Sequence, residues 1–225
     1  MSAPQSNMPS IALIGGTGNL GPGLALRWAH AGYPVIIGSR TADKAEITAK
    51  ELNEELGSEL VFGLENAAAV QRADICALTV VQAAHAAALT GLREELQGKL
   101  LIDATARLDF PDLSPPPAPA AARLAQNILG EGVRVVAAFQ NVPAKALRKN
   151  FKQPLDSDIL VCADDIAAAE TVIGLAEAAG LQAYYAGGLD SALTVEGITS
   201  LLVAMNRHYK SHAGTIKVAG IPHDK

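Results

Sequence analysis

Aromatic residues are scarce in this chain: they make up 4% of its 225 residues, whereas hydrophobic residues as a whole make up 49%. The interior is therefore built from Ala, Leu, Val and Ile, with few large rings to fill it. Such a composition suits helices packed on both faces of a parallel sheet. The length allows a real core and fits one large domain, alone or with a small appendage.

The chain also lacks an excess of positive charge and any long apolar run. A net charge of −5 argues against a general surface for nucleic acid or anionic membranes, although it allows a local basic pocket for a phosphate. No apolar run approaches the roughly 20 residues of a membrane span. The first ten residues lack the basic and apolar regions of a signal peptide. We therefore expect a cytoplasmic protein that binds neither nucleic acid nor a membrane.

Reactive side chains are few and scattered. Cys76 and Cys162 stand far apart, each inside an apolar run, which predicts buried, reduced thiols in strands rather than a disulfide or a metal site. His208 and His212 share one helix face and His223 lies downstream, but no third ligand stands at a recognisable spacing. We therefore expect no metal. The sequence also shows no convincing Ser/His/Asp or Cys/His arrangement for nucleophilic catalysis.

Strand-like and helix-like segments alternate along the first two thirds of the chain. Strands are expected at residues 11–15, 35–38, 60–64, 75–81, 100–104 and 133–139. Helices are expected between them, at residues 20–31, 42–56, 83–96 and 118–130. This alternation is typical of βαβ units, and it predicts an α/β fold with a doubly wound parallel sheet of the Rossmann type.

A shorter α/β pattern follows, beginning between residues 143 and 156. Its expected strands are 158–163 and 181–185, and its expected helices are 164–179 and a long final one at 190–212. Asp164 and Asp165 would begin the first of these helices as cap and N-terminal charge. The apolar spacing of the final helix is typical of a core or an interface, and we expect a homodimer.

The segment 109–119, DFPDLSPPPAP, is too rich in proline for a strand. It is either a rigid connector or a cover over the carboxyl edge of the sheet, and the first interpretation carries more weight.

Glycines concentrate where the first strand meets the first helix. The residues are Gly16-Thr17-Gly18-Asn19-Leu20-Gly21, a G-x-G-x-x-G motif. The first glycine permits a tight turn, the second lets backbone amides approach a pyrophosphate, and the third lets helix and strand pack closely. The strand before and the helix after are the context that the motif requires. The stretch therefore predicts dinucleotide binding at a helix N-terminus.

The end of the second strand indicates which dinucleotide. NAD enzymes place a carboxylate there for the adenosine ribose, whereas this chain has Ser39 and Arg40, with Lys44 one helical turn further on. A hydroxyl and two cations suit a 2′-phosphate, which a carboxylate would repel. We therefore expect NADP(H) rather than NAD(H).

The nicotinamide half should lie along the carboxyl ends of the remaining strands. The residues expected there as cofactor contacts are Thr79, Val80, Gln82, Ala138 and Asn141. His85 stands nearby at the start of a helix, where it is either a catalytic acid or a capping and packing histidine.

Three runs together resemble the bacterial branch of the F420H2:NADP oxidoreductases. They are ALIGGTGNLGPGLALRWAHAGYPVIIGSR, AFQNVPAKAL with the later DSDILVCADD, and the C-terminal VEGITSLLVAMNRHYKSHAGTIKVAGI. The resemblance covers nearly the whole chain. It implies direct hydride transfer between NADP(H) and the deazaflavin coenzyme F420, by positioning of two rings and without a catalytic side chain. The partners would thus be small-molecule redox substrates.

The resemblance also assigns residues. The glycine-turn and phosphate contacts of the family match those given above, and the residues beside the ring contact match Gln140 and Val142, with Pro143 turning the chain. Asn206 on the final helix would face the substrate or a partner subunit, or solvent. Three positions differ from many relatives: Gln82 replaces a tryptophan, Gln140 replaces a histidine or asparagine, and residues 105–107, Thr-Ala-Arg, replace Asn-Pro.

These differences leave the acceptor open, because all of them lie at the expected ring-binding end. The alternatives are an NADPH-dependent reductase of FMN, riboflavin or an imine, and a non-catalytic NADP(H)-binding sensor. For the domains, we expect a flexible N-terminus (1–9), an NADP-binding Rossmann domain (10–145) and a smaller C-terminal unit for substrate binding and dimerisation (146–225).

Overall fold

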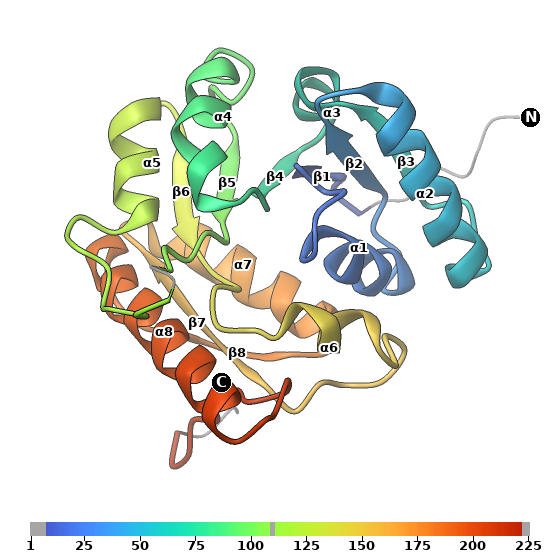
Figure 1. Cartoon of the computed structure of the whole chain (residues 1–225). Coiled ribbons are helices and arrows are strands. Elements are labelled where there is room, and N and C mark those ends of the chain that lie inside the picture. Colours follow the sequence, from blue (N-terminus) through green and yellow to red (C-terminus); the bar gives the residue numbers. More distant parts are fainter. Residues whose placement is uncertain (1–7, 109–110, 222–225) are drawn as a thin grey trace, which may run out of the picture.

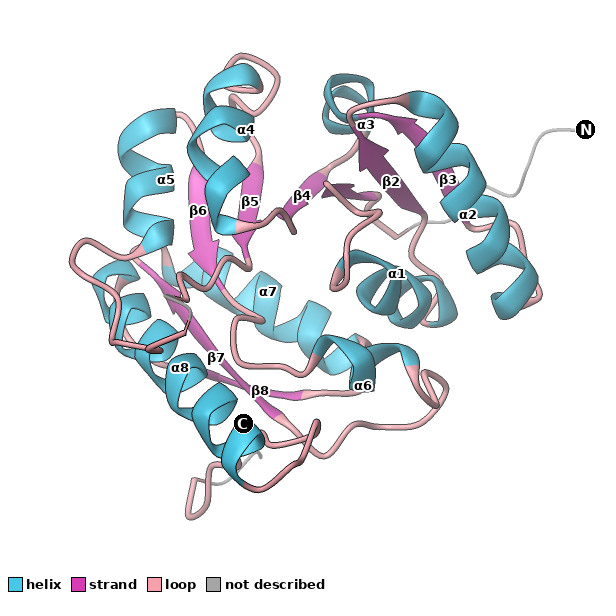
Figure 2. Cartoon of the chain, in the orientation of Figure 1, coloured by secondary structure: helices cyan, strands magenta, loops and turns pink. Residues whose placement is uncertain are grey.

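A computed structural model describes residues 8–108 and 111–221 of the chain. Within them, eight strands form one sheet in the order β3-β2-β1-β4-β5-β6-β7-β8 (Figures 1 and 2). The strands are β1 (Ile11–Ile14), β2 (Val35–Ser39), β3 (Val61–Glu65), β4 (Ile75–Leu78), β5 (Leu100–Asp103), β6 (Arg134–Ala137), β7 (Asp158–Ala163) and β8 (Gln182–Tyr185). The helices are α1 (Gly21–His30), α2 (Ala42–Leu56), α3 (Asn66–Arg72), α4 (His85–Gly91), α5 (Ala121–Leu129), α6 (Ala144–Arg148), α7 (Ile166–Ala178) and α8 (Ala192–His208), with 3₁₀ turns η1 (Gln82–Ala84) and η2 (Leu189–Ser191).

The first six strands are all parallel, and their order is the one found in dinucleotide-binding Rossmann folds. The predicted fold class is therefore confirmed. β7 pairs antiparallel with β6, and β8 runs parallel to β7, so both strands extend the same sheet. The division of the chain at residue 145 into two functional units stays a prediction.

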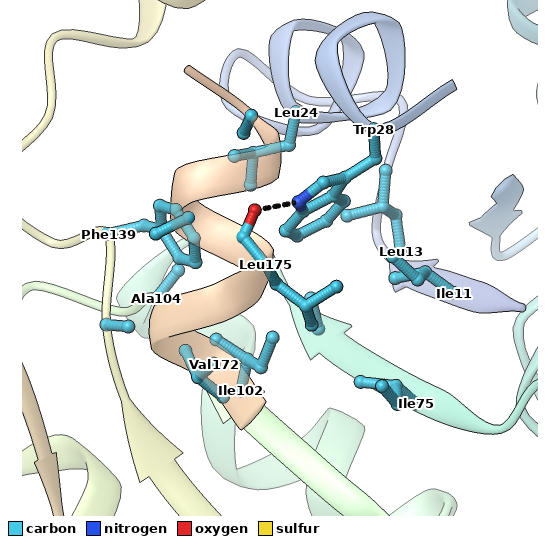
Figure 3. Packing of buried hydrophobic residues seen from close by; sticks show 14 of the residues in the cluster. Ile11, Leu13, Leu24, Trp28, Ile75, Ile102, Ala104, Phe139, Val172 and Leu175 are labelled. Atoms are coloured by element: carbon cyan, nitrogen blue, oxygen red, sulfur yellow. Dashed lines mark hydrogen bonds between the residues drawn. The ribbon is translucent and has the colours of Figure 1, made fainter. Parts of the chain in front are cut away.

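The sheet has a core on each face, because side chains alternate along each strand. On β1, Ile11 and Leu13 join a cluster with α1, α2 and α7, whereas Ala12 and Ile14 join a cluster with α3, α4, α5 and α8. Trp28 is the largest side chain of the first cluster (Figure 3). Its indole nitrogen donates to the carbonyl of Leu175 at 2.8 Å, which joins α1 to α7.

Two smaller sequence predictions are confirmed. Cys76 on β4 and Cys162 on β7 are buried free thiols, and burial raises the pKa of Cys76 to about 12 and that of Cys162 to about 11. Asp165 caps α7, since its carboxylate accepts hydrogen bonds from the amides of Ala167 and Ala168.

Several element boundaries differ from the sequence predictions. The helix expected at 83–96 ends at Gly91, and turns follow it to Gly98, whose positive φ of 77° ends the segment. The final helix ends at His208 instead of 212, and Lys210 adopts a φ of 52° just beyond it. The strand expected at 75–81 ends at Leu78.

Two helices, α5 and α3, also differ from the sequence predictions. The helix expected from 118 begins at Ala121, after Pro119, which has no N–H to donate. The short helix α3 was not anticipated from the sequence at all. Its seven residues are too few to show a clear apolar period.

Candidate functional site

The strand order reverses between β1 and β4, because successive strands are first added on one side of β1 and then on the other. β1 leads outward to β2 and β3, whereas β4 leads the other way to β5 and β6. Ligands of open α/β sheets bind in the crevice that such a reversal leaves at the carboxyl ends of the strands. The two strand ends are tied together here, because both the amide and the hydroxyl of Thr79 donate to the carbonyl of Ile14 at 3.0 Å.

The motif glycines at this crevice have different physical reasons. A Cβ on Gly21 would lie 2.3 Å from the carbonyl oxygen of Gly16, so close packing of the turn against α1 requires glycine there. A Cβ on Gly18 would come no closer than 3.5 Å to any other protein atom considered, the carbonyl oxygen of Gly15. Gly18 is also exposed. The protein itself therefore tolerates a side chain at position 18, and the bare backbone there fits the close approach of a ligand.

The start of α1 offers unpaired donors beside Gly18. Among the described residues, no acceptor pairs with the amides of Asn19 and Leu20, and no side chain caps the helix. Pro22 occupies the first turn and has no amide of its own to satisfy. Unpaired amides at the positive end of a helix dipole are suited to phosphate groups.

A second group of positive charge lies at the end of β2. Ser39 is the last residue of that strand and is 6% exposed, whereas Arg40 and Lys44 are exposed. Neither cation forms an ion pair with any residue that the structure describes. Both remain available to an anion, and α2, which carries Lys44, begins without a side-chain cap.

Three buried polar atoms lack partners at the opposite side of the crevice, beyond β5 and β6. They are Oγ1 of Thr105, Oε1 of Gln140 and Oδ1 of Asn141. Each of these residues is less than a tenth exposed, and each atom is unsatisfied by the rest of the described chain. A buried polar atom without a partner costs roughly 1–3 kcal/mol.

The chain is similar to known proteins over nearly its whole length. Residues 10–107 match the family model for coenzyme F420-dependent NADP oxidoreductase. The F420-dependent NADP reductase of Methanothermobacter thermautotrophicus is 39% identical over 224 residues, which cover 94% of this chain and 95% of the relative. That of Methanocaldococcus jannaschii is 40% identical over 222 residues, which cover 94% and 98%. The chain belongs to the F420-dependent NADP reductase family.

A solved structure supports the fold of this reductase family. A candidate F420-dependent NADP-reductase from Arthrobacter sp. FB24 superposes with a TM-score of 0.77, covering 95% of this chain and all of that one. The two sequences are 24% identical, so this likeness shows the fold alone. No described helix is both long and apolar enough to span a membrane.

The other residues expected at the reductase site lie at the same edge of the sheet, with one exception. Val80 packs against Gly15, Gln82 is exposed on η1, and Ala138, Val142 and Pro143 follow β6. Asn206 stands apart from this group.

Asn206 lies near the end of α8, where its side-chain oxygen accepts the amide of Gly214 at 2.9 Å. Other α8 residues do contact the edge, among them Thr199, whose hydroxyl donates to the carbonyl of Gln140 at 3.2 Å. The substrate role given to Asn206 therefore remains a prediction without a contact to these edge residues.

Asn66 and Asp103 form hydrogen bonds with residues of the candidate site, although no sequence pattern identified them. The side-chain oxygen of Asn66 accepts the amide of Gly15 at 3.2 Å and so holds the start of the glycine turn. Asp103 is fully buried, and one of its carboxylate oxygens lies 2.7 Å from Nε2 of His85. Its other oxygen accepts the amide of Thr105. His85 is only 6% exposed and its ring is held by Asp103, as a packing histidine would be.

The described histidines show no metal cluster. No group of three or more His, Cys, Asp or Glu side chains among the described residues could hold a metal ion. His208 and His212 are both exposed, and His223 lies outside the described residues.

Proposed function

We propose that this protein transfers a hydride between NADP(H) and coenzyme F420. The observation that carries the proposal is the edge of the sheet where the strand order reverses between β1 and β4. Among the described residues, backbone amides without an acceptor lie at one end of this edge, and buried polar atoms without a partner lie at the other. The two ends of this sheet edge match the adenosine half and the nicotinamide half of a dinucleotide. The ring of the second substrate would lie beside the nicotinamide. The curated relatives, which carry the name F420-dependent NADP reductase, support the pair of substrates.

The adenosine end of NADP(H) is assigned to the first half of the chain. The amides of Asn19 and Leu20 would hold the diphosphate over Gly18, with Gly16, Thr17 and Gly21 shaping the turn. Ser39, Arg40 and Lys44 would bind the 2′-phosphate, since they are the polar and cationic groups at the end of β2.

The nicotinamide end is assigned to the residues that follow β4 and β6. Thr79, Val80, Gln82, Ala138 and Asn141 would border the nicotinamide. Gln140, Val142, Pro143 and Asn206 are assigned to the deazaflavin. The unsatisfied oxygens of Gln140 and Asn141 accept hydrogen bonds, so they suit the amide groups that both rings carry.

Bound NADPH supplies the hydride, and no protein nucleophile is needed for its transfer. The work of this chain is then to hold two rings face to face and to exclude water between them. Positioning alone contributes a large share of the rate in such reactions. Ala138 and Val142, which follow β6 and are buried, add apolar surroundings at the nicotinamide end.

A direct assay tests the proposal. Purified protein is mixed with NADPH and oxidised F420, and the visible absorbance of the deazaflavin is followed. We expect the absorbance to bleach with NADPH and far more slowly with NADH. Absence of bleaching at high protein concentration would remove F420 as the substrate, and FMN, riboflavin and a cyclic imine would then be assayed in the same way.

We also propose that two copies of the chain assemble through α8. Leu201, Met205 and Tyr209 recur every four residues along this helix and are 64%, 53% and 72% exposed. An apolar stripe of this kind is typical of a helix that packs against a partner. Light scattering should give the mass of a dimer for the wild type and of a monomer for Met205→Glu. The two buried free thiols suit a reducing compartment, and we place the protein in the cytoplasm.

A further inference from the structure

A small hollow lies beside the ring-binding end of the crevice. It has a volume of about 250 Å³ and is lined by Gln82, Arg107, Leu108, Ser114 and prolines 115–117. The proline-rich segment thus lies against η1 and the residues that follow β5, as a cover over this edge would. Pockets for drug-sized ligands hold roughly 300–1,000 Å³, so this hollow fits one substituent of a ligand better than a whole ligand.

Arg107 is held in a fixed orientation at this hollow. Its Nε donates to the carboxylate of Glu196 at 2.8 Å, and its backbone amide approaches the same oxygen at 3.4 Å. Glu196 is fully buried on α8, and its other oxygen accepts the amide of Ala121 at 2.7 Å. The carboxylate therefore has donors on both oxygens, and it fixes the guanidinium by one edge only.

The other edge of the guanidinium has no partner among the described residues. Nη2 is buried without an acceptor, and Nη1 forms no hydrogen bond with any residue that the structure describes. Among the residues that line the hollow, Arg107 alone carries a charge, while Gln82 and Ser114 add neutral hydrogen-bonding groups. A guanidinium that is held in place at this hollow, and whose Nη groups have no acceptor among the described residues, suits an oxygen of a carboxylate or a phosphate.

We propose that Arg107 binds an oxyanion on the side chain of the second substrate and so selects acceptors that carry one. The inference rests on the proposed function, because it assumes that the acceptor ring occupies the neighbouring edge beside Gln82. Arg107 does not take part in hydride transfer. It anchors the acceptor at a distance from the ring, and its loss raises KM for an anionic acceptor while kcat stays unchanged.

Two variants separate this role from a purely structural one. Arg107→Lys keeps a cation for Glu196 but loses the fork of Nη groups, whereas Arg107→Gln removes the charge as well. Arg93→Gln is the matched control, because Arg93 is an exposed arginine that the hollow does not include. The ligands are F420, which carries phosphate and carboxylate groups on its side chain, and the same deazaflavin ring with a neutral ribityl side chain. Binding to the NADP⁺-saturated protein is followed by deazaflavin fluorescence, which needs no turnover.

We expect the wild type and Arg93→Gln to bind F420 at least about tenfold more tightly than the neutral ring. Both Arg107 variants should lose most of this preference, with the affinity for the neutral ring unchanged. A preference that survives in both variants, or that is absent from the wild type, would overturn the proposal.

Binding of neither deazaflavin would instead contradict the proposed function. In that case, the binding of inorganic phosphate tests the role of Arg107 independently of the deazaflavin. It should raise the Tm of Arg93→Gln more than that of Arg107→Lys at equal ionic strength, and equal shifts would overturn the proposal.

Discussion

Gly18 gives the sharpest test of the site, because the protein alone does not explain why it is glycine. A methyl group at this position would stand 3.5 Å from the carbonyl oxygen of Gly15 and 3.7 Å from that of Thr79, which is ordinary contact. Gly18→Ala should therefore fold normally, with a free energy of unfolding within about 1 kcal/mol of the wild type. The same methyl group lies at the mouth of the β1–β4 crevice, where it would keep a diphosphate away from the amides.

The loss of NADPH affinity follows from those amides. The N–H groups of Asn19 and Leu20 have no acceptor among the described residues, and a hydrogen bond to a charged acceptor contributes roughly 1.5–3 kcal/mol. Losing both bonds removes about 3 kcal/mol or more, which corresponds to a more than hundredfold weaker Kd. Isothermal calorimetry with NADPH measures this loss, and urea unfolding measures stability on the same sample.

Gly21→Ala is the matched comparison for Gly18→Ala. Its Cβ would lie 2.3 Å from the carbonyl oxygen of Gly16, so the fold itself must shift. We expect this variant to lose about 1–3 kcal/mol of stability whether or not a nucleotide is bound. The reasoning would be refuted by a Gly18→Ala protein that folds normally and still binds NADPH as tightly as the wild type.

Three further predictions concern other parts of the chain. Arg40→Ala should weaken binding of NADPH about tenfold, since an exposed contact to a phosphate contributes about 1–2 kcal/mol. Binding of NADH should stay nearly unchanged. If calorimetry shows an equal loss of affinity for both nucleotides, Arg40 does not bind the phosphate. Asp165→Ala should lower the free energy of unfolding in urea by about 1 kcal/mol through loss of the α7 cap, whereas Glu170→Ala on the same helix should change it by less than about 0.5 kcal/mol. Burial raises the pKa of Cys76 to about 12 and of Cys162 to about 11, so both thiols stay protonated at pH 8. Iodoacetamide should then label both thiols only after the protein is unfolded, as detected by mass spectrometry. Rapid labelling of the native protein would show that the thiols are accessible.

The part of the site that the sequence predicted is the part made by one continuous segment. The strand Ile11–Ile14, the glycine turn and the helix that follows are neighbours along the chain, so the spacing of their residues already fixes how they meet. The same holds for Ser39 and Arg40 at the end of the next strand. Helix boundaries were less predictable, because α4 gives way to turns after Gly91 and α8 ends two residues before Lys210, which adopts a positive φ.

Contacts between distant segments could not be predicted, because no local spacing encodes them. Asn66 holds the glycine turn from 51 residues away, and Glu196 orients Arg107 from 89 residues away. Each of these side chains is placed by the packing of its own element against the sheet. Only the folded chain shows that Nε of Arg107 is bound to Glu196, whereas its Nη groups have no acceptor among the described residues.

The sequence by itself thus determined the order of the strands along the chain, the glycine corner and the preference for NADP(H), since periodicity and adjacent motif residues are local properties. The tertiary structure decided how the acceptor end is built. There, Thr105 and Arg107 from the loop after β5 meet Gln140 from the loop after β6, and their burial leaves polar atoms without partners among the described residues. An unsatisfied buried atom is a property of the packed interior, and it has no signature in the order of the residues.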